Sequence, residues 1–197
     1  MNYRDKLEKL LEKKDGLVLT EEVEKEGIPR QYLNLFLKEN KLEKVSYGVY
    51  MKPNAVEDEL YIIQKKNKRV IYSHETALFL LDLTDRDPIN YSVTVPHGYN
   101  ASHLRKKGLD VHSVKEELHK MGVVKTKSIY NRLIYIYNKE RTICDIVKNR
   151  NNMDISLLNK SIKNYLNSKD KNIPLLLSYS TKLNIETVIR EYLEKLL

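Results

Sequence analysis

Residues 20–52 read TEEVEKEGIPRQYLNLFLKENKLEKVSYGVYMK, and they predict a helix, a turn, a second helix and a short two-stranded hairpin. Thr20 can cap the first helix, and the two glutamates after it interact favourably with the helix dipole. Gly27 ends this helix, and Pro29 suits the first position of the second one. This is the element order of a winged helix-turn-helix.

The second helix is amphipathic. Leu33, Phe36 and Leu37 recur at three- and four-residue spacing, so we expect them to share a buried face. Asn40 follows at the position where a left-handed residue closes a helix. The opposite face carries side chains of the types that read base edges or hold phosphates in a major groove. These are Arg30, Gln31, Asn34 and Lys38.

The hairpin is predicted from the tight turn at Tyr47-Gly48, which separates two short predicted strands. Lys44 and Lys52 flank it and could meet phosphates. With an amphipathic helix at the N-terminus, these elements predict a winged helix-turn-helix DNA-binding domain over residues 1–54.

A protein-docking module is the alternative interpretation, since the same packing occurs in proteins that do not bind DNA. A polar outer face is also normal for any surface helix. Against this, Gly27 and Pro29 lie where a winged domain needs them, and the polar face carries no acidic residue before Glu39.

Pro53-Asn54 breaks the chain, and residues 55–197 are predicted as a second, C-terminal domain. Its first part alternates helices and short strands, and everything after Glu140 has helical periodicity. The fold class is therefore α+β, with a winged helix-turn-helix followed by a mixed α+β domain that ends in a helical bundle. Helices are expected at 56–66, 75–83, 140–149, 154–167, 173–182 and 185–196, and strands at 70–72, 90–95, 109–114, 121–128 and 133–138.

Positive charge is concentrated in the middle of the chain. The net charge is +8, and residues 98–150 carry 12 basic and 5 acidic side chains. Such a basic region indicates a polyanion nearby, or else a lysine-rich solvated surface with no ligand. The candidates for a second DNA-binding or antitoxin surface are Arg105, Lys106, Lys107, Lys115, Lys120, Lys125, Lys127, Lys148 and Arg150.

Catalytic and metal-binding motifs are not found in the sequence. The six glycines form no phosphate loop or nucleophile elbow, and the histidines lack the partners of a zinc site. Arg141 and Asp145, four residues apart, are interpreted as an intrahelical ion pair. We therefore expect no enzyme activity, no metal and no cofactor.

The single cysteine, Cys144, excludes a disulfide framework and is interpreted as an inert core thiol. This fits a reducing, cytoplasmic interior. The sequence has no apolar run of about 18 residues, so we expect no membrane span.

Several segments together resemble one family. YGVYMKP (47–53), YSHETALFLLDLTDRDP (72–88), YSVTVPHGYN (91–100) and ERTICDIVKNRNNMD (140–154) are similar to the AbiE-type abortive-infection antitoxins, as is the ending LLLSYSTKLNIETVIREYLEKLL. These proteins are the antitoxin and regulator half of type IV toxin–antitoxin phage-defence operons.

The resemblance implies that the N-terminal domain represses its own promoter at inverted repeats in double-stranded DNA. It also implies that the C-terminal domain counteracts a nucleotidyltransferase-like toxin without a stable complex. By position, Ser46 and Tyr47 would contact DNA from the wing, beside the polar face of the second helix. Leu35 departs from the family, which often has a basic residue there, and Asn40 replaces a usual glycine.

The leading hypothesis is thus a DNA-binding autorepressor that is also an antitoxin. One alternative is a regulator that docks to a protein without touching DNA. Another is an enzyme that modifies RNA or the toxin.

Overall fold

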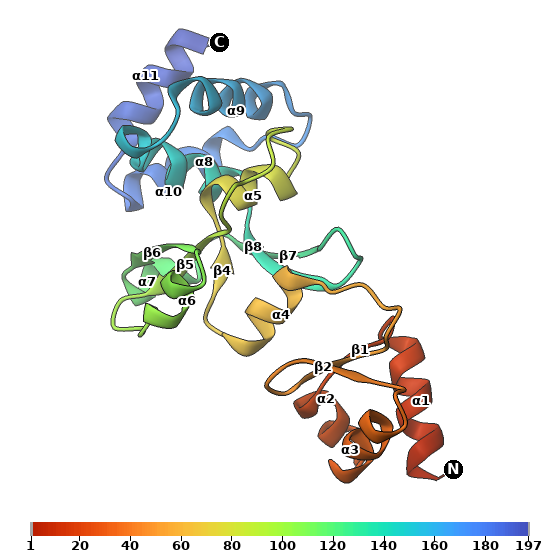
Figure 1. Ribbon diagram of the computed structural model, residues 1–197. Coiled ribbons are helices and arrows are strands. Elements are labelled where there is room, and N and C mark those ends of the chain that lie inside the picture. The colour runs from red at the N-terminus through yellow and green to blue at the C-terminus, as the bar shows by residue number, and fades with distance from the viewer. Residues whose placement is uncertain (1, 197) are drawn as a thin grey trace. The chain divides into compact units, whose positions relative to one another are not determined.

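The computed structural model describes residues 2–196, which form a mixed α+β protein with two β-sheets (Figure 1). The chain divides into two compact units, Met1–Ile62 and Ile63–Leu197. The boundary at residue 54 between two independently folding domains stays a prediction. No helix within the described residues has the length and apolar character needed to cross a membrane.

In the first unit, residues 3–51 form three helices and a three-stranded antiparallel sheet with the strand order β1-β3-β2. Its elements are α1 (Tyr3–Lys13), β1 (Leu17–Leu19), α2 (Thr20–Lys25), α3 (Gln31–Lys38), β2 (Glu43–Ser46) and β3 (Val49–Met51). Apolar side chains from all three helices meet in one core, which contains Leu7, Leu10, Leu11, Val23, Leu33 and Phe36.

Local chemistry explains where these helices begin and end. The Asn2 side chain caps α1 by accepting a hydrogen bond from the Asp5 backbone N–H. Gly27 after α2 and Asn40 after α3 both adopt the left-handed backbone conformation, as predicted, with φ of 69° and 55°.

Three details of this unit differ from the sequence-based expectations. Thr20 does not cap α2 but is its first residue, and the Glu22 carboxylate accepts a hydrogen bond from the Leu19 backbone N–H at 3.1 Å. Pro29 lies two residues before α3, because a short 3₁₀-type turn precedes the helix. No strand was expected over Leu17–Leu19, since three apolar residues in a row carry no periodic signal.

The second unit contains a five-stranded mixed sheet in the order β6-β5-β4-β8-β7. Pairs β5/β6 and β4/β8 are parallel, and pairs β4/β5 and β7/β8 are antiparallel. The elements from α4 onward are α4 (Glu59–Lys66), β4 (Ile71–Tyr72), α5 (His74–Leu80), β5 (Ser92–Pro96), α6 (Ser102–Lys106), β6 (Asp110–Val114), α7 (Glu116–His119), β7 (Val123–Lys127), β8 (Leu133–Tyr137), α8 (Lys139–Lys148), η1 (Arg150–Asn152), α9 (Ile155–Asn167), α10 (Ile173–Lys182) and α11 (Glu186–Leu196).

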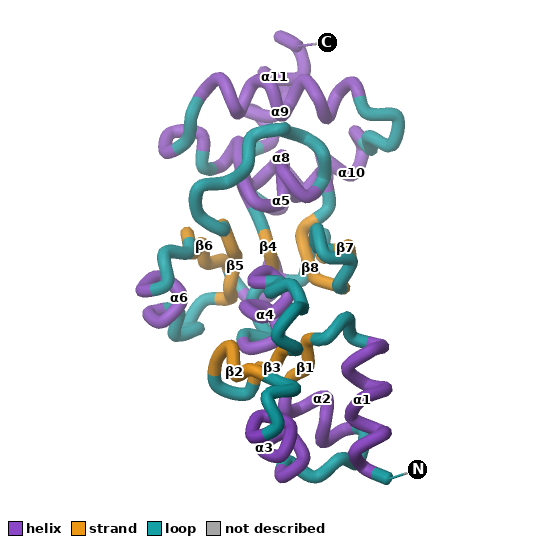
Figure 2. The backbone as a smooth tube through the Cα atoms, turned by 45° about the vertical axis from the view of Figure 1, so that its right-hand side comes forward, coloured by secondary structure: helices purple, strands orange, loops and turns teal. Residues whose placement is uncertain are grey.

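Helices α8 to α11 gather at one end of the five-stranded sheet (Figures 1 and 2). Their inward faces form an apolar core that includes Ile143, Ile146, Leu158, Ile162 and Leu176. The sequence predicted these long amphipathic helices to within a residue or two. It did not predict α6 and α7, which are too short to establish a helical period.

The start of α4 is a further correction. The helix was expected from Val56 but begins at Glu59, because the Asp58 carboxylate accepts a hydrogen bond from the Tyr61 backbone N–H and so ends the preceding loop. Val56 is exposed.

The predicted ion pair on α8 is confirmed, and it lies inside the protein. Arg141 Nε donates to Asp145 Oδ1 at 2.8 Å, and both side chains are buried. Arg141 Nη1 also donates to the carbonyl oxygens of Leu118 and Met121. The pair therefore links α8 to the segment that contains α7, which a surface ion pair would not do.

Candidate nucleic-acid interface

Helix α3 has one buried and one exposed face. Leu33 and Phe36 are each 1% exposed, and they pack against the apolar side chains of α1 and α2. The residues predicted to face DNA are all exposed on the other side: Arg30, Gln31, Asn34 and Lys38. The helical periodicity of the sequence therefore predicted the buried and exposed faces of α3 correctly.

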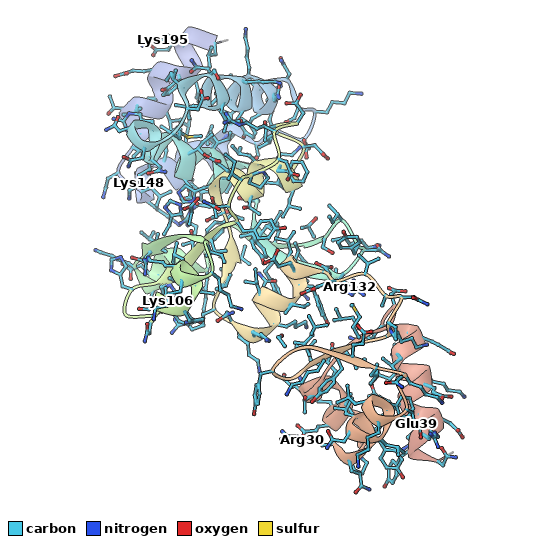
Figure 3. The ribbon with its side chains drawn as sticks, viewed as in Figure 1. Arg30, Glu39, Lys106, Arg132, Lys148 and Lys195 are labelled. Carbon is cyan, nitrogen blue, oxygen red and sulfur yellow. The ribbon has the colours of Figure 1, made fainter. Side chains whose placement is uncertain are left out.

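Arg30 occupies the cap position at the N-terminal end of α3 and pairs with Glu24 of α2. The hydrogen bond from this pair raises the pKa of the Arg30 guanidinium above its ordinary value. Both side chains remain accessible, at 67% and 44% exposure, so the pair is weak and the guanidinium is available to a ligand. In Figure 3, Arg30 and Glu39 mark the two ends of α3.

The hairpin β2–β3 presents a tyrosine and a lysine at its turn. Tyr47 is 87% exposed, and Lys44 Nζ lies 5.8 Å from the centre of its ring. Gly48 has a φ of 72°, which the turn requires and which glycine adopts without steric cost. An aromatic ring next to an ammonium group suits contact with a sugar–phosphate backbone.

Helix α3 and the hairpin together form a recess of about 190 Å³. It brings together four of the predicted DNA-binding residues, Arg30, Asn34, Lys44 and Tyr47. Its other lining residues are Thr20, Leu33, Gly48 and Tyr50. Tyr50 was not among the predicted contacts, although it lines the recess and pairs with Lys44 across the hairpin. Knowledge of the pairing register of β2 and β3 would have identified Tyr50.

The remaining predicted contacts lie outside the recess. Gln31 and Lys38 are exposed on α3, and Ser46 is half-buried at the end of β2. Lys52 follows β3 at the end opposite the turn, and its backbone N–H donates to the Gly16 carbonyl at 2.8 Å. Three strand residues separate it from the turn, about 10 Å along the chain.

The nine candidate basic residues of the second unit lie on several different elements. Arg105 and Lys106 lie on α6 and Lys107 directly after it, whereas Lys125 and Lys127 lie on β7. Because α6 leads into β6, and β6 and β7 are opposite edge strands, the sheet separates the two groups. Figure 3 marks Lys106 and Lys148 in different parts of this unit. Lys115 and Lys148 line a cavity, and Lys120 and Arg150 lie after α7 and in η1.

Across residues 2–196, no three His, Cys, Asp or Glu side chains are placed to hold a metal ion together. Cys144 is buried, and burial raises the pKa of its thiol to about 12, so at neutral pH it stays protonated.

Comparison with known proteins gives two findings. Residues 5–51, from α1 to β3, match the model of a family described as transcriptional regulator, AbiEi antitoxin. The crystal structure of the Rv2827c protein from Mycobacterium tuberculosis has a similar fold, with a TM-score of 0.58 and 11% sequence identity. The match covers 91% of this chain and 71% of that one. Among curated proteins, none matches this chain in sequence.

Proposed function

We propose that the protein is a DNA-binding autorepressor that also acts as an antitoxin, because residues 5–51 match the family of AbiEi antitoxin transcriptional regulators. In this proposal residues 1–54 are a winged helix-turn-helix, with α3 as the recognition helix and β2–β3 as the wing. Residues 55–197 form the antitoxin domain.

The observation that carries the proposal is the convergence of Arg30, Asn34, Lys44 and Tyr47 on one recess. In helix-turn-helix proteins, residues near the N-terminal end of the recognition helix contact base edges. Arg30 and Asn34 are at that end, and both are of the types that make bidentate contacts, arginine with guanine and asparagine with adenine. Lys44 and Tyr47 lie beside them, where a phosphate backbone would pass.

The charge of the first unit suggests that affinity is shared between two protomers. Residues 1–54 carry 11 basic and 10 acidic side chains, so their general attraction for DNA is modest. Two copies on an inverted repeat would double the number of base contacts, as two-fold symmetric operators do. The proposed operator is therefore an inverted repeat in the protein's own promoter.

The proposed partner in toxin neutralisation is a nucleotidyltransferase-like toxin encoded in the same operon, a phage-defence system. The antitoxin acts on it through the second unit and without a stable complex. Repression and antitoxicity then depend on different surfaces, which makes them separable by mutation.

The test uses the full chain and a labelled duplex from the region upstream of its gene, measured by fluorescence anisotropy between 50 and 200 mM salt. We expect sequence-specific binding that weakens as salt rises. An Arg30→Ala, Asn34→Ala double variant loses about 1–3 kcal/mol for each base contact removed. Lys9→Ala, an exposed change on α1, serves as the matched control and binds like wild type.

The same variants are then co-expressed with the product of the neighbouring gene. The proposal expects the double variant to lose repression but keep neutralising the toxin. No specific promoter binding at 50 mM salt would contradict the DNA-binding part and favour a protein-docking regulator. A neighbouring gene whose product is harmless to the cell would contradict the antitoxin part.

A further inference from the structure

The second unit contains a cavity of about 600 Å³ at the carboxyl ends of two parallel strands. His97 follows β5 directly and Lys115 follows β6, and the His97 backbone N–H donates to the Val114 carbonyl at 2.8 Å. Helix α7 and the last residues of α8 and α10 form the other walls. In open α/β sheets, ligands commonly bind just outside the carboxyl ends of parallel strands.

Three lysines from three different elements line this cavity: Lys115 before α7, Lys148 at the end of α8 and Lys182 at the end of α10. Glu117 is the one carboxylate among the lining residues. The ammonium groups thus outnumber the acids, which favours a ligand with more than one negative charge. Lysine is a common phosphate ligand because its ammonium group acts as a point charge with three donors.

One of the three lysines contacts the backbone beside the cavity. Lys148 Nζ donates to the Leu183 carbonyl oxygen at 3.4 Å, which satisfies a carbonyl just after the end of α10. An ammonium group has three N–H donors, so two remain for a ligand. This contact directs Lys148 toward Lys182 and Leu183, which line the same cavity.

Part of the lining is apolar. Val114, Leu118 and Met121 are half-buried there, and Leu183 is buried. Ser113 and Asn184 add polar groups able to hydrogen-bond a heterocycle. The volume lies within the range of about 300–1,000 Å³ for small-molecule sites, which combine an apolar wall with a few polar groups.

We propose that this cavity binds a mononucleotide, with its phosphates on Lys115, Lys148 and Lys182 and its base against Leu118, Met121 and Leu183. An inorganic anion would leave the apolar wall unused, and an uncharged ligand would gain nothing from the three ammonium groups. This site lies within the second unit and is independent of the DNA-binding recess on α3.

Isothermal titration calorimetry of the full chain tests the proposal, with ATP, GTP, CTP and UTP as separate probes and inorganic pyrophosphate as the comparison. We expect at least one nucleotide to bind, and to bind more tightly than pyrophosphate because only the nucleotide covers the apolar wall. The double variant Lys115→Gln, Lys182→Gln is expected to bind that nucleotide at least tenfold more weakly. The matched control, Lys125→Gln, Lys127→Gln on β7, removes equal charge at the opposite edge strand and leaves affinity unchanged.

A second variant, Met121→Glu, places a carboxylate in the apolar wall. It should weaken nucleotide binding more than pyrophosphate binding. Thermal melting of each variant shows whether it is folded. Absence of binding by all four nucleotides would overturn the proposal, as would pyrophosphate binding as tight as theirs. Equal losses of nucleotide affinity in the cavity variant and the control variant would also overturn it. Promoter binding, measured on the same samples, reports the proposed DNA-binding function separately.

Discussion

The backbone N–H of Thr20 donates a hydrogen bond to the carbonyl oxygen of Gly48 at 3.0 Å, which ties the first residue of α2 to the turn of the hairpin. The turn is therefore anchored to the helical part of the first unit. Tyr47, next to Gly48, is held beside Arg30 and Asn34 as a consequence. The candidate interface depends on this contact between two segments that are 28 residues apart in the chain.

Asn34 and Lys44 should have different roles in DNA binding. Replacing Asn34 with alanine removes a possible base contact, so we expect a loss of about 1–3 kcal/mol on the operator and little on unrelated DNA. Replacing Lys44 with glutamine removes a phosphate contact. The log–log slope of affinity against salt then falls by about 0.9, equally for all sequences. Anisotropy titrations on operator and scrambled duplexes at several salt concentrations measure both effects.

Glu24 should weaken DNA binding, because it pairs with the Arg30 guanidinium and adds a negative charge near the interface. Glu24→Gln is expected to tighten operator binding modestly, because an exposed ion pair is weak. A double-mutant cycle with Arg30→Ala identifies the cause. If the gain persists in the Arg30→Ala background, the effect is general electrostatics and not release of this arginine.

Phe36 should be a principal source of stability in the first unit, since it is 1% exposed within the helical core. Phe36→Ala is expected to cost about 3–5 kcal/mol of unfolding free energy. Leu35→Ala is the matched control on the same helix, because Leu35 is 37% exposed, and it should change stability by less than about 1 kcal/mol. Urea unfolding followed by circular dichroism gives both values, and equal losses would contradict the assigned faces.

His74 and His112 should make the second unit less stable in mild acid. Their rings stack with centroids 3.5 Å apart, and burial lowers the pKa of both, that of His74 well below its usual value. The nearby Asp110 carboxylate opposes this for His112, whereas the His112 and Arg141 charges add to it for His74. The unfolded chain thus takes up protons near pH 6.5 that the folded chain does not.

The stability that the two neutral histidines contribute is therefore fully present above about pH 6.5. It is lost as pH falls toward the lowered pKa values of the folded state, by up to about 1.4 kcal/mol per pH unit for each histidine. Burial raises the pKa of Asp145 to about 6, which works in the opposite direction below that pH. Comparing urea unfolding of wild type and His112→Asn at pH 7.5 and 5.5 cancels the Asp145 contribution. A pH dependence as steep in the variant as in wild type would refute the role of His112.

Local periodicity was sufficient to predict α3 and its faces. Leu33 and Phe36 are buried and Asn34 is exposed because a helix repeats every 3.6 residues, and this repeat depends on no distant contact. Gly27 and Asn40 end their helices for a similarly local reason, since both accept a left-handed backbone. The long helices α9, α10 and α11 were predictable on the same grounds.

Strand pairing, in contrast, was decided by the tertiary structure. Leu17–Leu19 becomes β1 only because β3 lies beside it, and Tyr50 enters the recess only through its register opposite Lys44. The order of the five strands separates Lys106 from Lys125, and the parallel pairing of β5 with β6 places His97 beside Lys115 at one cavity. Hydrogen bonds between strands join residues far apart in the chain, so no local pattern reports them. The sequence by itself thus determined the helices and the polar face of α3, and the pairing of the strands decided which of its charged residues meet.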